Sequence, residues 1–131
     1  MTRIEKIRGK LSNLGDAILV TSDSNRFYAS GFESSAGYIL ISSGEATLYL
    51  DFRYCEMAKI AKEKGRLQPE INVVLIEKKR KEYIAEFCER NRVKVLLCED
   101  CSLTVSEFKA LEGEVDGVCS LSFAGSLLED C

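Results

Sequence analysis

Asn25-Arg-Phe-Tyr-Ala-Ser-Gly-Phe32 and Asp51-Phe-Arg-Tyr54 are the two short stretches of this chain that decide its fold. Between them, Tyr38-Ile-Leu-Ile-Ser42 and Ala46-Thr-Leu-Tyr-Leu50 flank a Ser43-Gly44 turn and predict an antiparallel hairpin whose second strand is half-buried. Each stretch falls where a strand hands over to a helix, and α/β sheets place the groups that meet ligands at such positions. The two stretches therefore predict an α/β fold with a recognition surface.

Helical and strand periods alternate in the first half of the chain. One helical face is predicted from the spacing of Ile4, Ile7, Leu11 and Leu14. Residues 16–21, which are apolar from Ala17 to Val20, predict a central strand buried on both faces. A short helix to Ala29 follows, and a longer one begins at Asp51 and is expected to end near Gly65. The inner face of the longer helix is predicted to hold Tyr54, Met57, Ala58 and Ala61.

The second half continues the same alternation. Strands are predicted at 73–76 and 93–97, with a helix at 79–91 between them. Thr104 and Glu107 form a capping box that starts another helix. The inward residues of that helix are predicted to be Val105, Phe108 and Leu111, and residues 116–119 are predicted as an edge strand. The fold expected is a three-layer α/β domain with a mixed sheet of five to six strands, one antiparallel hairpin and helices on both faces.

Composition limits the classes of protein that this chain can belong to. With 131 residues, 46% of them hydrophobic and 30% charged, it has the size and make-up of one soluble domain covering residues 1–131. Eighteen basic against 21 acidic residues give a net charge of −3, which disfavours a nucleic-acid partner. The charged start of the chain and the lack of a long apolar run predict no secretory signal, no membrane span and a cytoplasmic location.

The six cysteines are expected to be reduced thiols, most of them in the core. Cys98-Glu-Asp-Cys101 has the spacing of a redox-active pair of thiols. The two acidic residues between the thiols are expected to raise the pKa values of both and so to oppose redox activity. A zinc site would need a second pair of ligands, and the chain has no His. Cys131 is expected to be an exposed thiol.

Asp51 and Arg53 are the polar residues with the clearest alternatives. Asp51 is expected to cap the helix that follows it. Arg53 lies in the first turn of that helix, where the dipole disfavours a cation, so its guanidinium is expected to meet a carboxylate of Asp51, of another chain or of a substrate. Asn25 is expected to cap a helix, while Tyr28 and Phe32 pack. No phosphate loop, zinc-protease motif or nucleophile elbow is present, so no catalytic residue and no metal ligand is predicted.

The order and spacing of these segments resemble the N-terminal domain shared by Xaa-Pro aminopeptidases, prolidases and creatinase. The likeness rests on the two opening stretches, on Ser34-Ser-Ala-Gly-Tyr38 and on the flanking elements, and it runs nearly end to end. The family's two segments fall on Asn25, Tyr28, Ser30, Gly31 and Phe32, and on Asp51, Arg53 and Tyr54. The tail departs from the pattern, because relatives continue into a basic helix where this chain has Ser126-Leu-Leu-Glu-Asp-Cys131.

The resemblance implies a ribonuclease H-like topology and a domain that performs no chemistry itself. A separate C-terminal catalytic domain of pita-bread fold, absent from this chain, would hold two divalent metal ions such as Mn, Co or Zn and cleave the bond before proline. The N-terminal domain would help to form a homodimer and line the entrance to the active site. The residues expected near the substrate are Arg53, Asp51, Tyr54, Asn25, Tyr28 and Phe32.

Two other functions remain open. A free-standing binding or assembly module would self-associate without any peptidase connection. A ribonuclease H-like nuclease would share the topology, but that chemistry needs acidic residues on the first strand, and residues 17–20 are wholly apolar.

Overall fold

The computed structural model describes residues 2–11, 14–34, 36–68, 70–100, 103–125 and 127. Its helices are α1 (Arg3–Leu11), α2 (Asp23–Ser30), α3 (Phe52–Glu63), α4 (Arg80–Asn91) and α5 (Val105–Val115). Its strands are β1 (Ala17–Val20), β2 (Tyr38–Ser42), β3 (Ala46–Leu50), β4 (Ile71–Leu75), β5 (Val95–Cys98) and β6 (Ser120–Phe123). Cys101, Cys131 and most of the 126–131 tail lie outside the described residues.

The strands form one six-stranded mixed sheet in the order β4-β3-β2-β1-β5-β6. β2 pairs antiparallel with β1 and with β3, whereas the β3–β4, β1–β5 and β5–β6 pairs are parallel. The other five strands therefore all point the same way. Their carboxyl ends lie at one edge of the sheet, and β2 alone among the six starts from that edge, which we call the carboxyl edge.

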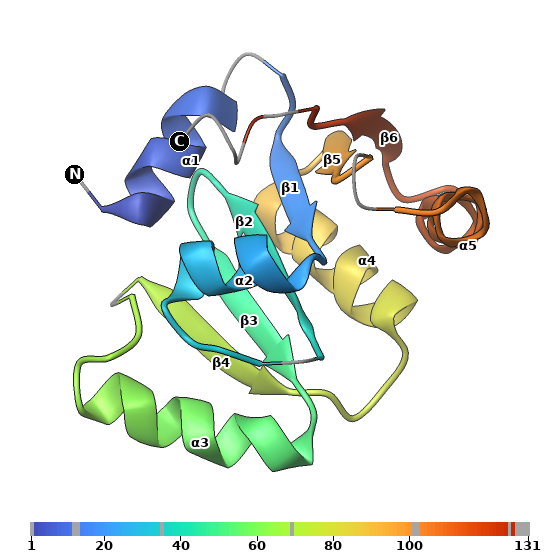
Figure 1. Cartoon of the computed structure of the whole chain (residues 1–131). Coiled ribbons are helices and arrows are strands. Elements are labelled where there is room, and N and C mark those ends of the chain that lie inside the picture. Colours follow the sequence, from blue (N-terminus) through green and yellow to red (C-terminus); the bar gives the residue numbers. More distant parts are fainter. Residues whose placement is uncertain are drawn as a thin grey trace.

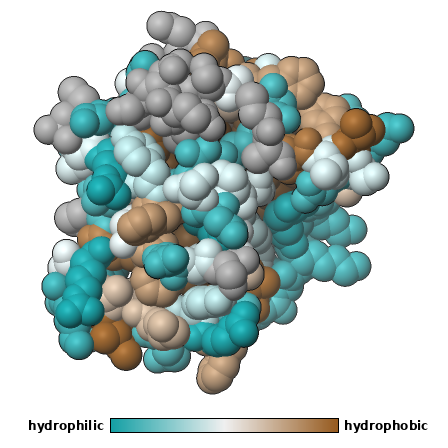
Figure 2. All heavy atoms as spheres, viewed as in Figure 1, coloured by the Kyte–Doolittle hydropathy of each residue, from teal (hydrophilic) through white to brown (hydrophobic). Residues whose placement is uncertain are grey.

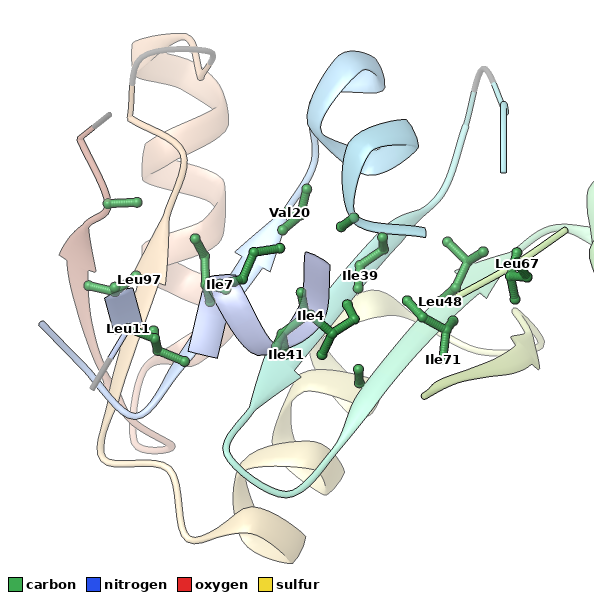
Figure 3. Close-up of a cluster of buried hydrophobic side chains, with 14 of the residues drawn as sticks. Ile4, Ile7, Leu11, Val20, Ile39, Ile41, Leu48, Leu67, Ile71 and Leu97 are labelled. Atoms are coloured by element: carbon green, nitrogen blue, oxygen red, sulfur yellow. The ribbon is translucent and has the colours of Figure 1, made fainter. Parts of the chain in front are cut away.

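Helices cover both faces of the sheet (Figure 1). α1, α2 and α3 pack on one face, and α4 and α5 pack on the other. Figure 3 shows Ile4, Ile7 and Leu11 of α1 beside Val20, Ile39 and Ile41 of the sheet; all six side chains are buried. The expected α/β class, with a mixed sheet and a central first strand, is confirmed.

Alternate side chains of each central strand enter opposite layers of the core. In β1, Ile18 and Val20 join the layer under α1, whereas Ala17 and Leu19 join the layer under α4. β3 is buried over its whole length, so the prediction that its second face is exposed was wrong. The reason is α4, which lies over that face and leaves polar Thr47 to donate to Glu45 at 2.7 Å.

Two residues predicted on inner helix faces are exposed. In α3, Ala58 is buried as predicted, but Met57 is 54% exposed and Cys55 is buried. In α5, Leu111 is buried as predicted, but Val105, the first residue after the Thr104 cap, is 72% exposed. The last strand is β6 at Ser120–Phe123, four residues after the position predicted, because residues 116–119 are used to turn the chain after α5.

The hairpin turn is tied to α4 by Glu45. Its carboxylate accepts from Arg90 at 2.8 Å through two nitrogens and from Asn91 at 3.0 Å. Arg90, opposed by partial burial and assisted by Thr47 and Asn91, lowers the pKa of Glu45 to about 2.

This depressed pKa predicts a loss of stability in acid. A carboxyl group whose folded pKa lies below its ordinary value of 4.5 stabilises the fold above that value, and the stabilisation is lost as pH falls toward 2. Glu45→Gln should remove about 1 kcal/mol at pH 7, because Arg90 is half exposed and water screens the pair, and almost nothing at pH 2. Urea unfolding between pH 2 and 7 measures this, with Glu112→Gln on the exposed face of α5 as control. Equal losses at both ends of the range would contradict the assignment.

Within the described residues, no helix is both long and apolar enough to cross a lipid bilayer.

Candidate recognition site at the carboxyl edge

The carboxyl edge of the sheet gathers the starts of α2 and α3 beside the end of β5. Ser22 caps α2 directly after β1, and Asp51 caps α3 directly after β3. Glu99 follows the last residue of β5, which is paired with β1. Two helix starts, the Glu99 carboxylate and the loop from Gly31 to β2 therefore share this edge.

Glu99 holds the start of α2 in place. Glu99 is only 4% exposed. One oxygen of its carboxylate accepts hydrogen bonds from the backbone amides of Thr21 at 2.5 Å and Ser22 at 2.8 Å. The other oxygen accepts from the Ser22 hydroxyl at 2.8 Å and the Asn25 amide group at 2.7 Å. A buried carboxylate is tolerated when it is bonded in this way. The sequence signal was an acid placed immediately after a buried parallel strand.

Arg26 is the second buried charge of this edge, and it was not predicted. It is 2% exposed and donates to the carbonyl oxygens of Thr21 at 2.7 Å, Ser34 at 2.7 Å and Gly37 at 3.1 Å. It also donates to the Ser34 hydroxyl at 3.2 Å and to Asp23 at 2.5 Å. One guanidinium thus joins the residue after β1, the loop before β2 and Gly37, which directly precedes β2. We call this set of contacts the Arg26 clamp.

A hollow of about 520 Å³ opens between α2, the loop and α3. Its lining residues are Asp23, Ser24, Phe27, Glu33, Ser34 and Tyr54. Two aromatic rings and two carboxylates around one hollow suit a ligand with both apolar and positively charged parts. Figure 2 shows this side of the molecule, where apolar side chains lie in small groups among hydrophilic ones.

Three of the predicted residues meet at the first turn of α3. Asp51 accepts from the Tyr54 amide at 3.2 Å, so its expected role as a helix cap is confirmed. The guanidinium carbon of Arg53 lies 4.8 Å from the centre of the Tyr54 ring, and Tyr54 lines the hollow. Arg53 forms no ion pair with any residue that the structure describes, so Asp51 is not its carboxylate partner.

The other three predicted residues are spread along α2 and the loop. Asn25 is bonded to Glu99 and donates its backbone amide to Ser22, so Ser22 and not Asn25 caps the helix. Tyr28 packs on the core beside Arg3, whose guanidinium carbon lies 5.4 Å from the ring centre. Phe32 packs against the same layer of the core. The structure therefore brings together Asp51, Arg53 and Tyr54 but not all six residues.

The cysteines take structural positions. Cys55, Cys88 and Cys98 are buried free thiols, and Cys119 is partly buried. Burial, assisted by the charges of Asp100 and Glu99, raises the pKa of Cys98 to about 11, as the acidic sequence predicted. Among the described residues, no group of three or more His, Cys, Asp or Glu is placed to hold a metal ion.

Solved structures with this architecture include proline-specific peptidases and the N-terminal domain of one peptidase. The Xaa-Pro dipeptidase from Bacillus anthracis matches 98% of this chain with a TM-score of 0.83 and 26% identity, and the match covers 34% of that protein. The N-terminal domain of cytoplasmic peptidase PepQ from Mycobacterium tuberculosis H37Rv matches 98% of this chain and 96% of its own, with a TM-score of 0.80 and 27% identity. The fold of this chain is therefore shared with these peptidases.

The chain belongs to the Creatinase/Prolidase N-terminal domain family, whose profile matches residues 3–131. A Mycoplasma genitalium protein named "Putative Xaa-Pro aminopeptidase" is 39% identical over 93 residues, which are 71% of this chain and 24% of that protein. The chain thus covers about a quarter of the length of this relative and of a second one from Mycoplasma pneumoniae. The expected resemblance is confirmed, and the homologues are Xaa-Pro peptidases.

Proposed function

We propose that this chain is the non-catalytic N-terminal domain of a metal-dependent Xaa-Pro dipeptidase or aminopeptidase. It folds as a unit over residues 1–131 and contributes dimer contacts and substrate-entrance contacts to a pita-bread catalytic domain. The observation that carries the proposal is the family match over residues 3–131, together with an edge site that can recognise a ligand. A cytoplasmic location accords with the cytoplasmic peptidase among the similar structures.

The proposed substrate is a proline-containing peptide with a free amino end. Arg53 is exposed, carries no described ion pair and is held over Tyr54, so its guanidinium is available to a peptide carboxylate or carbonyl oxygen. Asp23 and Glu33 on the rim of the hollow favour the cationic amino end. In this proposal Asp51 and Tyr54 position Arg53, while Asn25, Tyr28 and Phe32 fix the helix and loop that form the opposite wall.

The metal pair belongs to the catalytic domain in this proposal. Family catalytic domains are metal-dependent, and two divalent ions such as Mn, Co or Zn would supply the activated water there. The described residues of this chain offer no fitting set of ligands. The role of this chain is therefore to bind and orient the peptide and to restrict the entrance.

Arg53→Ala should weaken substrate use in a rejoined enzyme. The chain would be fused to the catalytic domain of the Bacillus anthracis Xaa-Pro dipeptidase and assayed with Mn²⁺ or Co²⁺ on Xaa-Pro dipeptides. Loss of a charge-assisted hydrogen bond of about 1.5 to 3 kcal/mol predicts a kcat/KM at least about tenfold lower, mostly through KM. The unfused chain should hydrolyse nothing.

Lys62→Ala provides the matched control, because it removes a cation from the exposed end of the same helix. It should leave KM within about twofold of the native value. Hydrolysis by the purified unfused chain, or equal KM values for the Arg53 variant and the native fusion, would overturn the proposal.

A second candidate is a free-standing assembly module, and the exposed apolar side of α3 favours it. Phe52, Met57 and Ile60 are 76%, 54% and 50% exposed on that helix. This candidate predicts self-association that survives Arg53→Ala, which sedimentation measures. It also predicts that the fused enzyme gains nothing from the presence of this chain.

A nuclease function has weaker support. The strand order, with β2 reversed between β1 and β3, is consistent with the ribonuclease H-like topology that we propose for the chain. However, β1 is Ala-Ile-Leu-Val and fully buried, so it offers no acid to hold metal ions. Cleavage of an RNA–DNA hybrid in the presence of Mg²⁺ would be required to revive this candidate.

A further inference from the structure

A second hollow lies at the carboxyl edge, on the sheet face covered by α4 and α5. It has a volume of about 620 Å³ and is lined by Gly37, Tyr38, Lys79, Arg80, Lys81 and Glu114. The hollow beside α3 lies on the other face and shares none of these lining residues. The second hollow joins the start of α4 to the start of β2, and we call it the α4 pocket.

Four consecutive basic residues mark the start of α4. Lys78, Lys79, Arg80 and Lys81 stand at the positive end of the helix dipole, where cations are disfavoured by about 0.3 to 1 kcal/mol each. Two of the four are neutralised, because Lys78 pairs with Glu86 and Arg80 pairs with Glu114. Lys79 and Lys81 are exposed and form no ion pair with any residue in the described ranges. Two cations therefore stand at a helix start, and no ion pair with a described residue accounts for them there.

The first backbone amides of α4 are also available. The Lys79 amide donates to Glu82 at 2.9 Å, and the amides of Glu82 and Tyr83 donate back to the Lys79 carbonyl. The amides of Arg80 and Lys81 have no acceptor among the described residues. Free amides at a helix start attract an anion through both hydrogen bonding and the dipole.

Tyr38 adds an independent observation. It is 6% exposed, and its buried hydroxyl has no hydrogen-bond partner among the described residues. The ring is stacked 4.9 Å from Tyr49, which in turn lies 5.1 Å from Tyr83. The Tyr83 hydroxyl donates to Leu75 at 3.0 Å and accepts from Glu77 at 2.8 Å. Within this stack, Tyr38 lines the α4 pocket with a donor that lacks an acceptor.

A buried hydroxyl without an acceptor is costly, by about 1 to 3 kcal/mol, so the missing partner calls for an explanation. Burial raises the pKa of Tyr38 above its ordinary value, so the group is a neutral O–H donor at physiological pH. Tyr38 lines the α4 pocket together with Arg80 and Glu114.

We propose that the α4 pocket binds a phosphate-type oxyanion, held by the first amides of α4, the Tyr38 hydroxyl and the ammonium groups of Lys79 and Lys81. A tetrahedral dianion presents oxygens in several directions and can meet donors from a helix start, a strand and two side chains at once. A planar carboxylate presents only two oxygens, and Glu114 already supplies that shape to Arg80 at 2.5 and 2.8 Å.

Binding of inorganic phosphate to the full 131-residue chain tests the proposal. Isothermal titration and thermal unfolding would be measured in phosphate and in chloride of equal ionic strength. Phosphate at ten times its dissociation constant should raise the unfolding midpoint by about 4 °C. Phosphoserine is the second ligand; tighter binding of phosphoserine indicates a phosphoryl group on a larger molecule, and equal or weaker binding indicates the free ion. Acetate binding as tightly as phosphate would overturn the proposal.

Tyr38→Phe removes only the hydroxyl and separates binding from folding. The variant should unfold in chloride at the native midpoint or above it, because no described hydrogen bond is lost, and should bind phosphate about fivefold to tenfold more weakly. Tyr83→Phe is the matched control, since it loses two bonds and should destabilise the fold without changing phosphate affinity. Native affinity in Tyr38→Phe, or a clear loss of its stability in chloride, would refute the assignment.

The lysines give a second and independent arm. The double change Lys79→Gln and Lys81→Gln should weaken phosphate binding at least about tenfold, and the same double change at Lys59 and Lys62 of α3 should not. Equal weakening by both pairs would show a general charge effect and would contradict a built site.

Discussion

Gly37→Ala is expected to lower the free energy of unfolding by about 3 to 5 kcal/mol. Gly37 has φ of 112°, in the region that side chains rarely adopt. An added Cβ would lie 2.5 Å from the Tyr49 carbonyl oxygen and 2.8 Å from a Leu50 methyl carbon. Both contacts are shorter than van der Waals distance, and the first is with backbone, so β2 and β3 would have to separate where they pair. Urea unfolding of the chain measures the loss.

Gly113→Ala is the matched control for this change. Gly113 lies inside α5, and an added Cβ there would have no neighbour within 4 Å. The change should therefore raise stability by about 0.5 to 1 kcal/mol, because alanine favours a helix. If Gly37→Ala cost less than about 1 kcal/mol, the close approach of Gly37 to β3 would be disproved.

Arg26→Met should be almost as damaging, with an expected loss of about 3 to 5 kcal/mol. Methionine fills much of the space but provides no donor, so the carbonyl groups of Thr21, Ser34 and Gly37 would lose their shared partner. Asp23 would lose its ion pair, but it is 72% exposed and water replaces the contact. Most of the loss therefore comes from carbonyl groups that are buried or partly buried. Urea unfolding and hydrogen exchange of the loop amides both report it.

Arg66→Met controls for the loss of a surface arginine, because Arg66 is exposed in the turn after α3. Its stability should stay within about 0.5 kcal/mol of the native chain. Arg26→Lys should recover less than half of the loss, since an ammonium cannot reproduce the planar fork. A loss below about 1 kcal/mol in Arg26→Met would show that the clamp does not hold the edge together.

Local patterns were sufficient for most of the fold. The hairpin bounds at Tyr38–Ser42 and Ala46–Leu50 agree with the structure because the turn residues and the apolar runs define them together. The Thr104 cap was predictable because a capping box is a contact between near neighbours. Met57 and Val105 were misplaced because periodicity alone does not specify that Cys55 is buried in α3 or that the first residue of α5 stays exposed.

The site was less predictable because its main contacts are distant in sequence. Glu99 bonds to Ser22 across 77 positions, and only the pairing of β1 with β5 brings them together. The burial of Arg26 was not predicted because a charged residue is normally expected at the surface. Ala29 and Ser30, which are also buried, lie on the same inner side of α2. Arg53 and Tyr54 could be singled out from the sequence because both are adjacent to a recognisable helix cap, and their part in recognition stays a prediction.

The Arg26 clamp also bears on how such a domain can diversify. The second half of the loop before β2 is fixed at Ser34 and at Gly37 by hydrogen bonds to one guanidinium. Extra residues inserted between these two positions would alter the mouth of the hollow while leaving the strand register and the helix starts unchanged. Sequence changes in this loop can therefore alter ligand preference while the sheet and its helices keep their structure.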